Sequence, residues 1–141
     1  MSAMRPAMYW KRFANRDVIC HLCPHQCILS EGEMGQCNAR QNIDGTLVAL
    51  TYGHPIAIHI DPVEKKPLYH FFPGTKVFSV ATSGCNLHCM HCQNWEISQQ
   101  THILEPFRSP EAIIEMALAS GCQAIAFTYS EPLVWYEYLL H

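Results

Sequence analysis

In the first half of the chain the apolar runs are short, and turn-forming residues separate them. Segment 46–52 is rich in β-forming residues and follows Asp44-Gly45, a dipeptide typical of a two-residue hairpin turn. A second short strand is expected over 56–60. The prolines within 61–74 argue against regular structure in the connection that follows. The pattern therefore predicts a small β module in this part of the chain.

The second half has the pattern of buried strands that alternate with helices. A continuous, largely apolar run over 76–82 is typical of a strand buried in a parallel sheet. Ser109 supplies the N-cap of a helix, and the next apolar run, 123–129, predicts a second buried strand. Pro132 then opens another helix. The order strand, helix, strand, helix indicates an α/β fold built on a βαβ unit.

We therefore expect two parts in the chain. Residues 1–75 form the N-terminal module with its lead-in, which we predict to be helical over 8–13, and residues 76–141 begin an α/β barrel. Two parallel strands cannot cover their own faces, because buried strands need neighbours and helices on both sides. We expect the chain to be the truncated N-terminal part of a larger protein, inactive and prone to aggregation by itself.

Composition and charge narrow the class of protein. The chain has 141 residues, of which 49% are hydrophobic and 15% are charged, as in ordinary globular domains. Nine Lys and Arg against twelve Asp and Glu give no positive field for nucleic acid, so we expect no nucleic-acid partner. We see no signal peptide and no run long enough to span a membrane, so a cytoplasmic location without membrane contact is expected.

Seven of the eight cysteines fall into two clusters, and in a reducing compartment such clusters indicate metal binding or chemistry rather than disulfides. The first cluster lies among turn-forming glycines and a proline, so the N-terminal β module is cysteine-rich. Four thiolates in such a module suit a closed zinc site or an auxiliary iron–sulfur cluster, and unligated or redox-sensing thiols are a third reading. The members are Cys20, Cys23, Cys27 and Cys37. The remaining cysteine, Cys122, is expected to be a small core residue.

The second cluster, Cys85, Cys89 and Cys92, directly follows the predicted strand 76–82. Closed zinc sites take four protein ligands, whereas three thiolates leave one iron of an iron–sulfur cluster open to a further ligand. The count of three therefore favours an iron–sulfur cluster. Zinc, with His88 or His91 as the fourth ligand, is the alternative.

The sequence around the second cluster, CNLHCMHCQNWEISQ, resembles the cysteine motif of the radical S-adenosylmethionine (SAM) superfamily. The segments CPHQC, GEMGQCNARQNIDG, DPVEKKPLYHFFPG and TYSEP accompany it in a fixed order. Together they resemble the radical SAM member of the AmmeMemoRadiSam system, which is related to pyruvate formate-lyase activating enzymes. The resemblance extends over about residues 17–138. It implies that the α/β part is the N-terminal part of a partial (β/α) radical SAM barrel.

The resemblance also implies a chemistry. Cys85, Cys89 and Cys92 would hold a 4Fe-4S cluster whose fourth iron binds SAM. A one-electron reductant such as flavodoxin or ferredoxin would reduce the cluster, which then cleaves SAM to a 5'-deoxyadenosyl radical that abstracts hydrogen from a substrate the sequence does not identify. Such an enzyme would be an activating-enzyme-like oxidoreductase.

The same resemblance assigns four further residues to SAM binding. His91 stands where an aromatic residue packs near the adenine in the superfamily. Thr128, Ser130 and Glu131 stand where a Gly-Gly-Glu-type motif binds the methionine amino group. Glu131 is the main candidate, since a carboxylate matches an ammonium group, although an acidic residue at a helix N-terminus is also favoured by the helix dipole.

The residues by themselves also allow a second class of function, a non-catalytic one. Both cysteine clusters could bind zinc or iron–sulfur groups in a non-catalytic interaction module. The metal distinguishes the two readings, because iron with labile sulfide indicates the enzyme and zinc at both sites indicates the module.

Overall fold

The computed structural model describes residues 4–99 and 105–141. The strands are β1 (Trp10–Arg12), β2 (Val18–Cys20), β3 (Ile28–Leu29), β4 (Arg40–Ile43), β5 (Thr46–Ala49), β6 (Pro55–Pro62), β7 (Lys76–Thr82) and β8 (Ala124–Phe127). The α-helices are α1 (Trp95–Ser98), α2 (Pro110–Ala119) and α3 (Tyr136–Leu139), and the 3-10 turns are η1 (Ala14–Arg16), η2 (Val63–Lys65) and η3 (Pro132–Trp135). The fold is thus mixed α/β, with several sheets and few helices.

The N-terminal region contains the small sheets β1-β2-β3 and β4-β5, both antiparallel. The hairpin predicted at Asp44-Gly45 is confirmed: Ile43 pairs with Thr46, and the two turn residues have φ values of 53° and 72°. A type I′ turn requires such positive φ values at both positions, which Asp and Gly tolerate.

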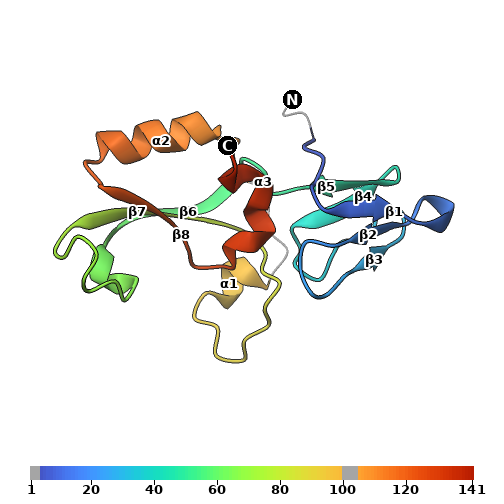
Figure 1. Ribbon diagram of the computed structural model, residues 1–141, viewed down its shortest axis with the longest axis horizontal. Helices are drawn as coiled ribbons and strands as arrows, with labels where there is room; N and C mark the ends of the chain where they lie inside the picture. Colours follow the sequence, from blue (N-terminus) through green and yellow to red (C-terminus); the bar gives the residue numbers. More distant parts are fainter. Residues whose placement is uncertain (1–3, 100–104) are drawn as a thin grey trace.

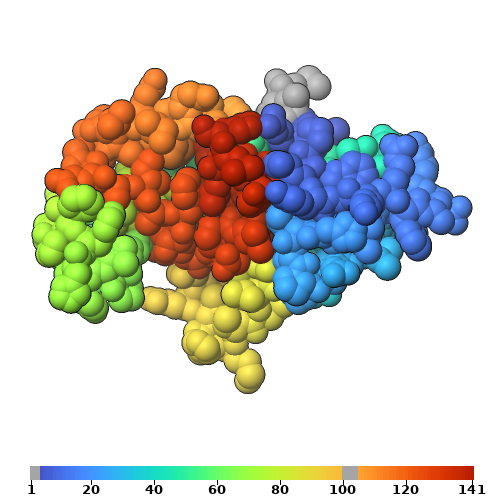
Figure 2. Space-filling model, viewed as in Figure 1, coloured from blue at the N-terminus to red at the C-terminus, as the bar shows by residue number. Residues whose placement is uncertain are grey.

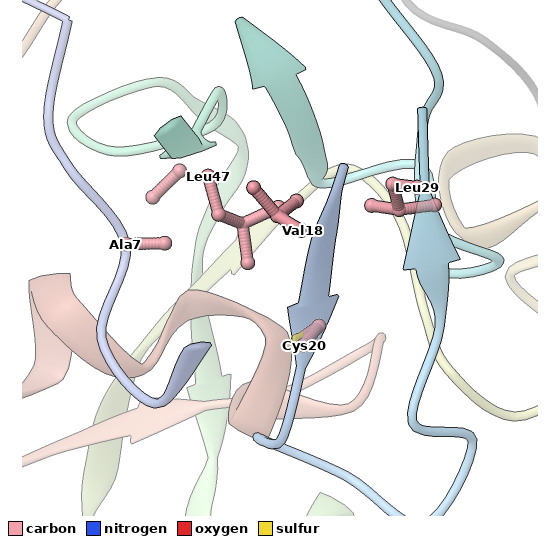
Figure 3. Close-up of a cluster of buried hydrophobic side chains, with 6 residues drawn as sticks. Ala7, Val18, Cys20, Leu29 and Leu47 are labelled. Carbon is pink, nitrogen blue, oxygen red and sulfur yellow. The ribbon is translucent and has the colours of Figure 1, made fainter. Parts of the chain in front are cut away.

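The predicted helix over residues 8–13 is wrong, because β1 forms there and pairs with β2. Left-handed backbone at Tyr9 and Asn15, each with a φ of 55°, interrupts a helix on both sides of β1. The apolar side chains of this region form one cluster around Val18 and Leu47, which lie side by side in Figure 3. Cys20 belongs to the same cluster, so the first cysteine ligand candidate is part of the module's core.

The second region is the sheet β6-β7-β8, with α2 lying over one face (Figure 1). β7 and β8 are parallel, with Val77 paired to Ala124, and α2 makes the crossover between them. The predicted βαβ unit is therefore confirmed, as is the N-cap of α2, where the Ser109 hydroxyl accepts from the backbone N–H of Ala112. α2 packs Ile113 and Ala117 against the sheet.

β6 pairs antiparallel with β7, so this sheet extends across residue 75, where the sequence places a domain boundary. That boundary stays a prediction, and so does the barrel: in the described ranges β7 and β8 are the parallel pair. Among the helices of residues 4–99 and 105–141, none is long and apolar enough to cross a bilayer.

The helical segment that begins at Pro132 lies between the two regions (Figure 1). Its first turn is 3-10 and continues into α3, as the proline predicts. Glu137 of α3 forms a two-pronged ion pair with Arg40 of β4, at 2.8 and 2.7 Å, and both side chains are only 2% exposed. Glu137 also accepts a hydrogen bond from the backbone N–H of Met8. This buried pair joins the N-terminal module to the α/β region.

Candidate functional site

The second cysteine cluster lies on the loop that follows the carboxyl end of β7, which we call the cysteine loop (residues 83–94). Gly84, the second residue of this loop, has a φ of +87°, a conformation that residues with a Cβ disfavour. A Cβ at Gly84 would lie 2.3 Å from the carbonyl oxygen of Cys37. The backbone N–H of Cys85 donates to that same carbonyl at 3.0 Å. The cysteine loop is therefore docked directly against the first cysteine cluster.

The three thiols of the cysteine loop differ in exposure: Cys85 is buried, Cys92 is half-buried and Cys89 is exposed. The Cys85 sulfur accepts from the backbone N–H of Leu87 at 3.4 Å, and the Cys92 sulfur lies 3.3 Å from the Ser98 hydroxyl. In Figure 2 the yellow atoms of this part of the chain project from the rest of the surface. The loop thus has one anchored end and one end open to solvent.

The donor set fits an iron–sulfur cluster better than a closed ion site, because it supplies three thiols on a loop with an exposed face. Within the described ranges, no three His, Cys, Asp or Glu side chains already stand in ligating geometry. Binding at this loop therefore requires rotation of the cysteine side chains. That rotation is unhindered at Cys89, which is exposed.

An open hollow lies beside the end of the cysteine loop, at the carboxyl end of β8. Its lining includes Lys65, Lys66, Gln93, Asn94, Thr128 and Ser130. The Asn94 amide donates to the carbonyl of Tyr129 at 3.0 Å, which ties the end of the cysteine loop to the segment after β8. Ligand sites of α/β proteins form at this edge of a sheet. The structure thus brings Thr128 and Ser130, two of the residues assigned to SAM binding, next to the residues that follow Cys92.

The other two residues assigned to SAM binding do not line this hollow. His91 is exposed on the cysteine loop. Glu131 caps η3, where its Oε1 accepts from the backbone N–H of Leu133 at 3.3 Å. This is the helix N-terminal role that the sequence left open for Glu131. The cofactor roles of His91 and Glu131 remain predictions.

Sequence reasoning missed a buried polar network below the hollow. The charged residues of segment 61–66 allow two interpretations from sequence: an entry loop that faces the active site or, as the favoured one, a solvated charge run. In the structure Asp61 is buried and accepts from Lys65 and Lys66 at 2.9 and 2.8 Å. Ser79 and Tyr129 also donate to its carboxylate. Burial acts to raise the pKa of Asp61, but these four hydrogen bonds outweigh it and hold the pKa well below its usual range.

Tyr129 is one of the four donors to Asp61, and the sequence analysis assigns it no role. Its backbone is left-handed, with a φ of 68°, and its ring lies 4.5 Å from the ammonium nitrogen of Lys66. Burial and the hydrogen bond to Asp61 raise the pKa of the Tyr129 hydroxyl. Its position at the end of the predicted strand 123–129 is a signal that could have identified it.

The first cysteine cluster surrounds a small cavity of about 20 Å³, which we call the four-cysteine cavity. Its lining includes all four predicted cysteines: Cys20, Cys23, Cys27 and Cys37. Cys20 and Cys37 are buried, whereas Cys23 and Cys27 are half-buried. Burial raises the pKa of the Cys20 and Cys37 thiols, and backbone N–H groups and the Arg40 guanidinium partly oppose this effect.

Comparisons with known proteins agree with the position of the cysteine loop. The sequence model of the Radical SAM superfamily matches residues 79–141, which run from within β7 to the end of the chain and include Cys85, Cys89 and Cys92. This match does not reach the first cysteine cluster.

Two curated relatives come from Methanocaldococcus jannaschii. The chain is 49% identical to the uncharacterized protein MJ0808 over 138 residues, which is 96% of this chain and 41% of MJ0808. It is 32% identical to the uncharacterized protein MJ0674 over 81 residues, which is 57% of this chain and 19% of that protein. The chain therefore spans about two fifths of the length of MJ0808. No solved structure matches the chain.

Proposed function

We propose that this chain carries the cofactor-binding part of a radical SAM enzyme. The proposal rests on one observation. The cysteine loop ends at Gln93 and Asn94, and these two residues line the same hollow as Thr128 and Ser130. The superfamily match covers all of these residues. A 4Fe-4S cluster with SAM bound to it would supply one-electron cleavage of SAM and hydrogen abstraction from a substrate.

Each thiol of the loop has its own task in this proposal. Cys85 anchors the group at the buried end of the loop, where the N–H of Leu87 donates to its sulfur and would stabilise the thiolate. The Ser98 hydroxyl is placed to do the same for Cys92. Cys89 closes the group from the exposed side. Because hydrogen bonds to ligand sulfurs raise the reduction potential of iron–sulfur groups, Leu87 and Ser98 would tune this site.

The hollow is the proposed binding place for the amino-acid end of SAM. Thr128 and Ser130 offer hydroxyl groups there, and Lys65 and Lys66 offer positive charge to a carboxylate. The Glu131 carboxylate would accept from the SAM ammonium group through Oε2, since Oε1 caps η3. His91 would pack its flat ring near the adenine. Asp61 would hold Lys66 and Tyr129 in place below the hollow.

The finer assignment rests on the sequence resemblance. The motifs over residues 17–138 support membership in the AmmeMemoRadiSam radical SAM group, with an activating-enzyme-like activity and a completed partial barrel in the whole protein. We propose a cytoplasmic enzyme that takes its electron from flavodoxin or ferredoxin. Its substrate is not assigned.

The direct test is SAM cleavage by the full-length protein under anaerobic conditions with dithionite. We expect 5'-deoxyadenosine to form, and we expect Cys89→Ala to lower its rate of formation by about 100-fold or more. Cys122→Ala is the matched control, because Cys122 is a half-buried cysteine outside both clusters. Equal rates in the two variants would contradict the proposal.

A further inference from the structure

We propose that Cys20, Cys23, Cys27 and Cys37 bind a single zinc ion in a closed site. This proposal does not depend on radical SAM activity, since the four-cysteine cavity lies outside the superfamily match. It chooses between the zinc ion and the auxiliary iron–sulfur cluster that the spacing alone left open. Four thiolates and no open position are the ligand set of structural zinc.

The local backbone brings the four cysteines together from three segments. Cys20 ends β2, and its backbone N–H donates to the carbonyl of Cys27 at 2.9 Å. Cys23 lies within the turn between them, where the N–H of Gln26 donates to the Cys23 carbonyl at 3.2 Å. Cys37 arrives from the turn before β4. The turn residues thus hold four sulfur-bearing side chains around one cavity without any disulfide among the described cysteines.

The size of the cavity favours one ion. A cavity of about 20 Å³ has room for about one water-sized occupant, which suits a single ion. The cavity stays open in part because residue 35 is glycine. A Cβ there would lie 3.6 Å from the sulfur of Cys37 and 4.0 Å from the sulfur of Cys27. Both distances are ordinary van der Waals contacts, so a side chain at this position would pack against both sulfurs.

The charges around the cavity favour thiolates. Arg40 lines it, is 2% exposed, and its Nε–H has no hydrogen-bond partner among the described residues. An unpartnered buried N–H is costly, and a thiolate sulfur would accept from it. The two terminal nitrogens of the Arg40 guanidinium already donate to Glu137 and to the Met8 carbonyl. Nε–H is therefore the group that could donate to a thiolate in the cavity.

The sulfurs line the cavity but do not already converge on one point. Binding therefore requires the cysteine side chains to reorient toward the cavity. Cys23 and Cys27 are half-buried and have space for this change.

A zinc ion here would stabilise the surface on which the cysteine loop rests. The Cys37 carbonyl accepts from the N–H of Cys85, and Asn86 of the loop lines the four-cysteine cavity. The His25 ring also hydrogen-bonds the carbonyl of Asn86 at 2.7 Å. The proposed closed site is thereby linked to the open one through a backbone hydrogen bond and through the His25 side chain.

Zinc and iron content of the full-length protein, with X-ray absorption at the zinc edge, tests the proposal. We expect about one zinc per chain with four sulfur ligands at about 2.3 Å, in wild type and in the variant with Cys85, Cys89 and Cys92 changed to Ala. Cys23→Ser should lose at least about nine tenths of the zinc, and Cys122→Ser should keep it. Because Cys23→Ser could unfold the module, the wild-type absorption spectrum is the independent readout.

Three results would overturn the zinc site. These are iron at the first cluster in the triple variant, zinc bound by nitrogen or oxygen ligands, and failure of the reduced protein to take up added Zn²⁺. A protein that holds zinc at the first cluster but does not cleave SAM would overturn the proposed function and leave the zinc site standing.

Discussion

The two cysteine clusters lie in contact with each other, yet their surroundings differ. The first encloses a cavity of about 20 Å³, with two of its four cysteines buried in the module. The second has one buried thiol, and the rest of its loop extends to an exposed turn beside an open hollow. A closed thiolate cage excludes further ligands, whereas an open loop admits one. On the two proposals, the same residue type would form a structural site where it is buried and a reactive site where it is open to solvent.

The first test of this comparison disrupts the contact between the two clusters. Gly84→Ala places a Cβ 2.3 Å from the Cys37 carbonyl in a left-handed backbone. We expect the free energy of unfolding to fall by about 3 to 5 kcal/mol, because both strain and a backbone clash result. Urea denaturation measures it. Gly32→Ala is the matched control: its φ is +81°, but nothing lies within 4 Å, so a loss of only about 1 kcal/mol is expected. Equal losses would show that the contact is unimportant.

The second test concerns the ion pair that joins the two regions. Glu137→Ala leaves Arg40 buried without its partner, and we expect a loss of about 3 to 5 kcal/mol of unfolding free energy. The double variant Arg40→Met with Glu137→Leu should recover much of this loss, since it removes both charges. Thermal unfolding of the wild type, Glu137→Ala and the double variant compares their stabilities. A double variant as unstable as Glu137→Ala would contradict this account of the pair.

The third test compares the two clusters by thiol reactivity in metal-depleted protein. Cys89 is exposed, whereas burial raises the pKa of Cys20 and Cys37. We expect iodoacetamide to modify Cys89 at least about 10-fold faster than Cys20 or Cys37 at neutral pH, because only accessible thiolates react. Peptide mass spectrometry over time gives the three rates. Similar rates would remove the contrast between an open and a closed site.

The fourth test measures how the ionisation of Asp61, next to the hollow, changes stability with pH. The pKa of Asp61 is lower in the folded state than its ordinary value of 3.8, so its stabilising contribution is complete above that value and is lost as pH falls below it. Asp61→Asn should reduce stability by about 2 kcal/mol at pH 7 and flatten the acid side of the stability profile. Urea titrations between about pH 2 and 7 measure both effects. An unchanged acid slope would show that another carboxylate controls it.

Much of the local structure follows from short-range sequence signals. The Asp44-Gly45 hairpin, the Ser109 cap of α2 and the parallel pair β7 and β8 depend on turn chemistry, capping and apolar runs, which sequence displays directly. The strand at residues 10–12 could not be predicted in this way. Its hydrogen bonds go to β2, and two left-handed residues that no local motif marks set its ends.

The candidate site shows the same division. The cysteines and the residues Thr128 and Ser130 are visible as motifs, and the structure brings the latter two to the hollow beside the loop. The Asp61 network was missed because burial of a charged run depends on contacts with Ser79 and Tyr129, which are distant in sequence. The contact of Gly84 with Cys37 was missed for the same reason.

The measurement that tests the central claim most directly is low-temperature electron paramagnetic resonance of the reduced, anaerobically reconstituted protein with and without SAM. The account predicts a cluster signal that changes with SAM and disappears when Cys85, Cys89 and Cys92 are all changed to Ala. The same variant should retain its zinc, since the closed site has its own four ligands. A signal that does not change when SAM is added, or one that persists in the triple variant, would contradict the assignment of the open site.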